Sequence, residues 1–318
     1  RDHREPLFEF TKRALVHFAV DQDQVQMTTR LSGDKTHFLP FNLGNEGHAG
    51  NPPADDGGYR TAYVWREVWQ RDSLLDILGR FMHLQVEEKR ILTDEGIRKI
   101  TKETMIFPRY HQLDCVRGLV GHAQANGPGR NYLIQHSAGS GKSNSIAWLA
   151  HHLSSLHDAA DKKVFDSVIV VTDRRILDQQ LQNTIYQFDH KQGVVQKIDE
   201  DTRQLVQALA TGTPIIITTL QKFPFIAETL EKLREETQWG VTISTKGKQF
   251  AVIVDEAHSS QSGESAMELK GVLNADHIQI AATSYAAEHG IDDDDADQLS
   301  GVVREMMRRG KQSNLSFF

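Results

Sequence analysis

Residues 131–150 read NYLIQHSAGSGKSNSIAWLA, a short apolar run, a loop of small residues and a second apolar run with helical spacing. The loop from His136 to Ser143 follows the phosphate-binding pattern of Gly, four residues and Gly-Lys-Ser, except that histidine occupies the first position. Strand, glycine-rich loop and helix are expected in the order that a phosphate-binding loop requires. A plain strand-to-helix turn of small residues is the weaker interpretation.

The residues of this loop have distinct chemical tasks. Gly139 and Gly141 let the backbone wrap an anion with its N–H groups. Lys142 can reach the β- and γ-phosphates of a nucleotide, and Ser143 can ligate Mg²⁺ at the start of the helix. The sequence therefore predicts a Mg-nucleotide site, whose cofactor-binding loop residues are Ser137, Gly139, Ser140, Gly141, Lys142 and Ser143.

A second motif lies in FAVIVDEAH, residues 250–258, where an apolar strand ends in two carboxylates and a histidine. Such a strand delivers its last residues to the carboxyl edge of a parallel sheet, where α/β proteins bind ligands. Asp255 is predicted to hold Mg²⁺ through water, and Glu256 to orient and deprotonate the water that attacks the γ-phosphate. With the phosphate loop, this pattern predicts an NTPase with catalytic residues Lys142, Asp255, Glu256 and His258 and metal ligands Ser143 and Asp255.

The remaining sequence around these motifs predicts the fold class. Short apolar runs alternate with helical runs at residues 132–136, 145–156, 167–172, 176–188, 214–219, 225–233, 250–256 and 264–273. Near-continuous apolar strands joined by helices are typical of a parallel sheet covered on both faces. An α/β domain is therefore expected from Tyr132 onward.

The preceding region has a different pattern. Two β-rich runs at about 14–20 and 24–31 predict a hairpin, and the Gly-, Pro- and Asp-rich residues 45–58 predict an exposed loop. Residues 59–84 carry apolar side chains at helical intervals and predict two helices, with Asp72 as an N-cap. A smaller α+β segment is therefore expected in front of the α/β domain.

Gln112 closes the sequence FPRYHQ, residues 107–112, just before a helical run. A glutamine amide offers a donor and an acceptor, which suit the N6 and N7 edge of adenine. Gln112 is therefore predicted to select ATP, the alternative being a surface glutamine at a helix start.

Two further strand ends, VVTDRR (170–175) and TTLQKF (218–223), carry hydroxyls, an amide and cations. Such groups bond phosphate oxygens without reading bases. Helix caps and solvated charges are the alternative for any single residue. The predicted DNA-binding residues are Thr172, Arg174, Arg175, Thr218, Thr219, Gln221 and Lys222.

The composition limits the classes of protein to which the chain can belong. The chain has 318 residues, of which 39% are hydrophobic and 25% charged, and its single cysteine, Cys115, excludes an intramolecular disulfide. No apolar stretch approaches the roughly 20 residues of a membrane-spanning helix, and the first residues lack a signal-peptide core. A cytoplasmic protein is expected. The net charge of −7 does not decide the partner, because Lys/Arg clusters recur along the chain.

Taken together, FPRYHQ, HSAGSGKS, VVTDRR, TTLQKF and VDEAH resemble the first motor lobe of a superfamily 2 helicase-like ATPase with a DEAH box. REPLFEFTKRALVHFAVD, MTTRL, FLPFN, YVWREVWQRDSLLDILGRFMHL, VDEAHSSQSGES and NLSFF extend the resemblance over nearly the whole chain. The family they resemble is the motor-bearing restriction (R) subunit of type I restriction-modification enzymes.

This resemblance implies an ATP-driven translocase of double-stranded DNA, joined to an endonuclease domain and working with methylase and specificity subunits. It implies that residues 1–88 are the end of the nuclease region and a linker, and residues 89–318 a first RecA-like lobe. The family's nuclease core precedes such a segment, and its third motor motif and second lobe, with an arginine finger, follow it. The chain is expected to be an internal part of a larger protein, inactive alone in cleavage and hydrolysis.

Two patterns are interpreted as decoys. AATS at 281–284 resembles the third motor motif but precedes the acidic residues 292–297, which favours a local insertion. Asp76 with residues 87–89 imitates a nuclease D…ExK pattern but is expected on a helix surface. Two other functions stay open: a nucleotide-binding regulatory module without a motor role, and a helicase or remodeller that acts on RNA.

Overall fold

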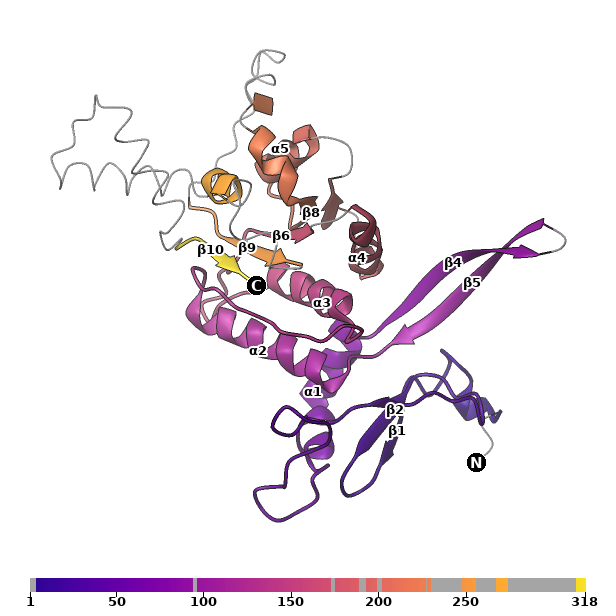
Figure 1. The fold of residues 1–318 in the computed structure, drawn as a ribbon. Coiled ribbons are helices and arrows are strands. Elements are labelled where there is room, and N and C mark those ends of the chain that lie inside the picture. The colour runs from indigo at the N-terminus through magenta and orange to yellow at the C-terminus, as the bar shows by residue number, and fades with distance from the viewer. Residues whose placement is uncertain are drawn as a thin grey trace, which may run out of the picture. The chain divides into compact units, whose positions relative to one another are not determined.

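The computed structural model describes residues 4–93, 96–172, 175–188, 193–198, 202–226, 228–229, 247–255, 267–273 and 313–318. The chain forms two compact units, Arg1–Arg117 and Gly118–Phe318 (Figure 1). The predicted domain boundary between residues 88 and 89 stays a prediction.

The first unit begins with η1 (Pro6–Phe8) and a small antiparallel sheet of β1 (His17–Val20), β2 (Val25–Thr28) and β3 (Leu39–Pro40). The predicted hairpin is therefore confirmed. The predicted loop at 45–58 is also confirmed, and its most buried side chain is Asn51, at 2% exposure. Asn51 Oδ1 accepts from the Leu43 N–H, and its Nδ2 donates to the Asp23 carbonyl, so this amide ties the loop to the sheet.

Three short helical segments follow: η2 (Val64–Val68), α1 (Arg71–Asp76) and η3 (Ile77–Phe81), of which η2 and η3 have π-helical hydrogen bonding. Their buried side chains include Val64, Val68, Ile77 and Phe81. The predicted N-cap at Asp72 is wrong. Gln70 has the extended backbone of a cap residue, with φ −60° and ψ 145°, and Asp72 lies inside the first turn. A carboxylate there still faces the positive end of the helix dipole.

A long two-stranded ribbon then leads to a helix. β4 (His83–Thr93) pairs antiparallel with β5 (Gly96–Ile106) along its full length, from His83 opposite Ile106 to Thr93 opposite Gly96 (Figure 1). The expectation that residues 87–89 lie on a helix surface is therefore wrong, because they belong to β4. α2 (Tyr110–Asn126) follows and spans the sequence division between the two units.

The second unit is built on a five-stranded parallel sheet. The strand order is β10-β9-β6-β8-β7, with β6 (Ser167–Thr172), β7 (Val195–Lys197), β8 (Ile215–Thr219), β9 (Phe250–Val254) and β10 (Leu315–Phe317). All six residues of β6, the central strand, are buried. Burial on both faces is the reason for the continuous apolar residues 168–171 in the middle of this strand.

Helices cover both faces of this sheet. α3 (Lys142–Ser154), α4 (Arg175–Gln187) and part of α2 pack on one face, around Val168, Val170 and Ile217. α5 (Thr202–Thr211), η4 (Leu220–Phe225) and helical residues 267–273 pack on the other. The predicted α/β class is therefore confirmed: a mostly parallel sheet between two helical layers, preceded by a smaller segment.

The residues before the phosphate loop do not form the strand predicted at 132–136. Asn131 makes one parallel bridge with Phe317, and the chain continues without regular pairing as far as the loop. The residues at 281–284 and 292–297 lie outside those described. Within the described ranges, no helix combines the length and apolar character needed to cross a membrane.

Candidate nucleotide-binding site

The phosphate loop has the backbone that its glycines predict. Gly139 has φ 73°, and Gly141 has φ 86° and ψ 35°, both in the left-handed region that favours glycine. Ser140, between them, is 7% exposed, and its N–H donates to the Ser137 carbonyl at 3.3 Å. Alternation of this kind turns successive N–H groups toward a common concavity, the arrangement that binds anions.

Helix α3 begins directly after Gly141, which is its N-cap residue. The Gly141 carbonyl accepts from the Asn144 N–H at 3.0 Å, which closes the first turn. Lys142 and Ser143 are the first two residues of this helix and are partly exposed. The N-terminus of a helix of this length carries partial positive charge, which favours the binding of a phosphate.

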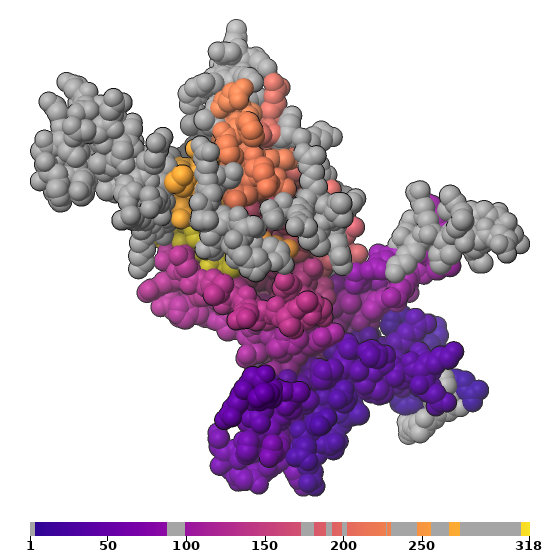
Figure 2. All heavy atoms as spheres, viewed as in Figure 1, coloured from indigo at the N-terminus to yellow at the C-terminus, as the bar shows by residue number. Residues whose placement is uncertain are grey.

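Contacts with the C-terminal strand hold the segment that leads to the loop. The Tyr132 N–H donates to the Phe317 carbonyl at 2.7 Å, and the Phe317 N–H donates to the Arg130 carbonyl at 3.2 Å. The Tyr132 ring stacks on Phe318 with 4.5 Å between centroids. Leu315 is 1% and Phe318 5% exposed, and a small yellow area of this strand is visible on the face shown in Figure 2.

Asp255 lies at the same edge of the sheet as the loop. Its N–H donates to the Val171 carbonyl at 3.0 Å, so it follows β9 directly beside the end of β6. Phe317 is paired with Val252 of β9 and bridged to Asn131, which places these three residues on one line across the parallel sheet. Both Asp255 and the loop therefore lie beyond the carboxyl ends of the strands. Glu256 and His258 lie outside the described residues.

The donor set fits Mg²⁺ and a nucleotide. Mg²⁺ prefers oxygen ligands and usually keeps several of its waters. The Ser143 hydroxyl and the Asp255 carboxylate would supply two oxygen ligands and leave the other positions to water and phosphate. The backbone N–H groups of the loop and the Lys142 ammonium suit the phosphate oxygens. A Cβ placed on Gly139 would meet no atom within 4 Å, so glycine is needed here for its backbone conformation.

Gln112 belongs to the first unit, in the first turn of α2. Its side chain is 3% exposed, and its Oε1 accepts from the Arg109 N–H at 2.9 Å. The residue is thus a buried member of the helix start instead of a surface glutamine. The bond ties the amide to the start of α2.

The predicted DNA-binding residues occupy the ends of β6 and β8 and the turn after β8. Thr172 and Thr218 are each 1% exposed, and neither hydroxyl has a hydrogen-bond partner among the described residues. Thr219 is partly exposed, Gln221 is exposed, and Lys222 Nζ donates to the Ile198 carbonyl at 2.6 Å. Arg175 begins α4, and Arg174 lies outside the described residues. Thr219 and Gln221 are thus the described members most open to a phosphate.

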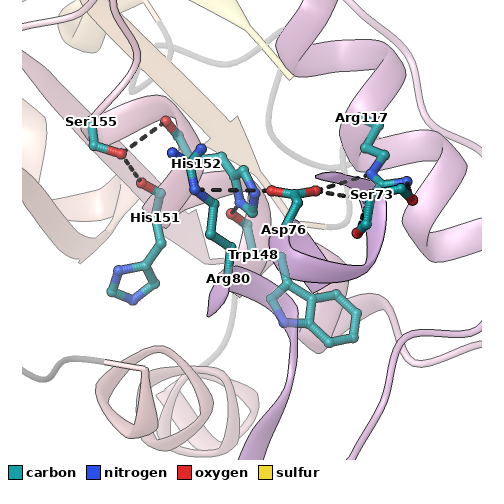
Figure 3. Close-up of polar contacts among 8 residues, drawn as sticks. All are labelled: Ser73, Asp76, Arg80, Arg117, Trp148, His151, His152 and Ser155. Carbon is teal, nitrogen blue, oxygen red and sulfur yellow. Dashed lines mark hydrogen bonds and ion pairs between the residues drawn. The ribbon is translucent and has the colours of Figure 1, made fainter. Parts of the chain in front are cut away.

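A contact that sequence reasoning missed joins α2 to α1 within the first unit. The Arg117 guanidinium donates to the Asp76 carboxylate and to Ser73. The two halves of this contact are 41 to 44 residues apart, and no local pattern signals a pairing at that separation. Asp76 is therefore engaged by a cation of its own unit (Figure 3).

Comparison with known proteins agrees with this geometry. The family model for the SWI2/SNF2 ATPase matches residues 111–289, more than half of the chain and a range that contains the phosphate loop and Asp255. No curated protein matches the chain. With its RecA-like parallel sheet, glycine loop and acidic strand end, the chain belongs to the SWI2/SNF2 ATPase family of helicase-like superfamily 2 motors.

Proposed function

We propose that this chain binds Mg-ATP through its phosphate loop and carries part of an ATP-driven motor that moves along double-stranded DNA. The observation that carries the proposal is the loop itself. Two left-handed glycines lead into the N-terminus of α3, at the sheet edge that also bears Asp255. The family's ATPase character supports the same reading.

The roles of the site residues follow from their chemistry. The loop N–H groups and Lys142 hold the phosphates, Ser143 and Asp255 hold the metal, and Gln112 reads the adenine edge. Glu256 orients and deprotonates the attacking water, and His258 completes the acidic motif. When bound, Mg²⁺ neutralises charge that develops on the β- and γ-phosphates.

The finer identity that we propose is the R subunit of a type I restriction-modification enzyme, a cytoplasmic complex with methylase and specificity subunits. The sequence motifs on both sides of the phosphate loop support it, from REPLFEF to NLSFF. In such a complex ATP hydrolysis moves DNA past the enzyme before cleavage. DNA would be held by phosphate contacts at the ends of β6 and β8, at Thr172, Arg174, Arg175, Thr218, Thr219, Gln221 and Lys222.

Calorimetry of Mg-ATP binding tests the nucleotide site. Lys142→Ala removes the cation that meets the phosphates, and a charge-assisted bond contributes about 1.5–3 kcal/mol, so affinity is expected to fall roughly tenfold to a hundredfold. Lys162→Ala, at an exposed lysine of the same unit, is the matched control and is expected to bind as the parent does. Equal affinities for Lys142→Ala and the parent would refute the site.

A second substitution tests the base. Gln112→Ala is expected to relax the preference for ATP over GTP, because the amide that matches adenine is lost while the phosphate contacts remain. Affinities for both nucleotides are measured at the same Mg²⁺ concentration. A variant that discriminates as the parent does would remove Gln112 from the site.

The DNA partner is tested by comparing duplex DNA with duplex RNA over a salt series. Phosphate contacts alone predict weak binding without sequence preference and a steep loss of affinity as salt rises. Duplex DNA is expected to bind more tightly than RNA, and the reverse order would favour an RNA-acting helicase. Assembly is tested with methylase and specificity subunits of type I enzymes, and the absence of any complex would contradict the R-subunit identity.

A further inference from the structure

The core residues of the second unit distinguish the two faces of its parallel sheet. Val170 of β6 is paired with Ile253 of β9 and with Ile217 of β8, and all three belong to the core under α3 and α4. Val171 and Ile216 belong to the core on the opposite face, because successive side chains of a strand alternate. The face that contains Val170 is therefore the α3 face, and α3 begins at the phosphate loop (Figure 1).

Two residues further along each strand, the α3 face changes from apolar to polar. Thr172 ends β6 and is paired with Thr219, which ends β8. Asp255 follows β9 two residues after Ile253, and its N–H donates to the Val171 carbonyl at 3.0 Å, so it lies beside the end of β6. Asp255, Thr172 and Thr219 therefore form a row of oxygen-bearing side chains on the α3 face, with neighbouring strands about 4.8 Å apart.

Thr172 is the buried member of this row. It is 1% exposed, and its Oγ1 has no hydrogen-bond partner in the part of the chain that the structure describes. A buried hydroxyl without a partner costs free energy, and such a group in a folded protein calls for a binding partner. Asp255 and Thr219 are only partly buried, so solvent reaches the row beside Thr172.

Thr218 shows that burial without a partner does not by itself assign a residue to this row. Thr218 is also 1% exposed, and its hydroxyl also lacks a partner among the described residues. Its pairing with Val171, however, places it on the face opposite to α3. Only Thr172 combines the buried hydroxyl with a position next to Asp255 and on the face of the phosphate-loop helix.

We propose that the Thr172 hydroxyl is a further member of the metal site and holds a water of the Mg²⁺ that Asp255 binds. Mg²⁺ usually keeps several of its waters. A carboxylate and a hydroxyl side by side give one such water an acceptor for each of its two protons. The inference rests on the proposed nucleotide function. Thr172 touches no phosphate in it and acts as a positioning residue for the metal, so the end of β6 serves the nucleotide as well as DNA.

The test compares the affinity of the 318-residue chain for ATP at saturating Mg²⁺ with that in EDTA, by calorimetry. Thr172→Val replaces the hydroxyl by a methyl group. It is expected to lower the ratio of the two affinities roughly threefold to tenfold, the usual contribution of one hydrogen bond. ATP affinity in EDTA is expected to stay unchanged, because the phosphate contacts of the loop remain. Thr172→Ser, which keeps a hydroxyl, is expected to recover most of the loss.

Urea unfolding of the nucleotide-free chain separates a metal role from a structural one. Loss of an unpaired buried hydroxyl is expected to leave the free energy of unfolding unchanged or to raise it, so a lower affinity ratio cannot come from a damaged fold. Thr213→Val is the matched control. Thr213 is 9% exposed, lies before β8 at the opposite edge of the sheet and donates to Gln196. This variant is expected to keep the affinity ratio of the parent. If Thr172→Val is insoluble, Thr172→Ala decides by the same ratio.

An unchanged affinity ratio in Thr172→Val would overturn the inference, and so would an equal fall of the ratio in Thr213→Val. A loss of duplex DNA binding with an unchanged ratio would leave Thr172 as a DNA contact alone. Lys142→Ala distinguishes failure of the nucleotide site itself. If Lys142→Ala binds ATP as the parent does, the proposed function fails; if Lys142→Ala weakens binding and Thr172→Val leaves the ratio unchanged, only the role of Thr172 fails.

Discussion

Phe318→Ala is expected to lower the free energy of unfolding of the second unit by about 3–5 kcal/mol, the usual cost of emptying a buried phenylalanine site. Phe318 is 5% exposed. Its ring is stacked on Tyr132 at 4.5 Å and meets Phe165 edge-on at 6.2 Å. Each aromatic pair contributes about 0.5–1.5 kcal/mol beyond its buried area, so the upper part of the range is expected.

The substitution isolates the side chain because the backbone bonds survive it. The Phe318 N–H donates to the Val252 carbonyl at 2.8 Å, and its carbonyl accepts from the Val254 N–H at 3.0 Å. Alanine keeps both bonds. The expected loss therefore reports ring packing and not a lost strand.

Equilibrium urea unfolding and thermal unfolding, followed by circular dichroism, measure the effect. A loss of this size lowers the midpoint temperature by roughly 6–20 °C for a unit of about 200 residues. Phe225→Ala, at a phenylalanine of the same unit that is 56% exposed, is the control and is expected to change the free energy by less than about 0.5 kcal/mol. Equal effects of the two substitutions would show that the packing around Phe318 is misjudged.

Two more predictions concern the first unit. Asn51→Ala removes the partner of the Leu43 N–H and of the Asp23 carbonyl, and one of the two bonds that Asn42 Oδ1 accepts. The free energy of unfolding is therefore expected to fall by about 1–3 kcal/mol in urea titration, and no change would contradict these bonds. Burial, followed by nearby negative charges, raises the pKa of Tyr110 from 10.0 to about 12. The neutral phenol contributes its full stability below pH 10, and this contribution is lost as the pH rises toward about 12. Tyr110→Phe is therefore expected to reduce the loss of unfolding free energy between pH 10 and about 12. An unchanged dependence of the unfolding free energy on pH in this range would refute the assignment.

The sheet of the second unit was predictable because each inner strand is buried on both faces. Residues 167–172 and 214–219 are near-continuous apolar runs, and they form β6 and β8 almost residue for residue. The phosphate loop was predictable for a different reason. Left-handed backbone at Gly139 and Gly141 is open to few residue types, so the sequence has to show glycine there.

The ribbon of β4 and β5 was not predictable from its pattern. Among the ribbon residues whose burial is described, Leu84, Val86 and Ile100 remain more than a third exposed. Apolar side chains that stay exposed do not give the alternating pattern from which a half-buried strand is predicted. The Arg117 contact was hidden for another reason, since its partners come together only through the tertiary packing of α2 on α1.

The pairing of the phosphate-loop segment with β10 has a consequence for biosynthesis. The Arg130 N–H bonds to Ser316 Oγ, a partner 186 residues further along the chain. At about 5–20 residues per second, roughly 10–40 s separate the synthesis of the two partners on the ribosome. Until then the nascent chain carries the loop sequence without the strand that holds it. Among the described strands of this sheet, the one that holds the phosphate-loop segment is therefore the last to be synthesised.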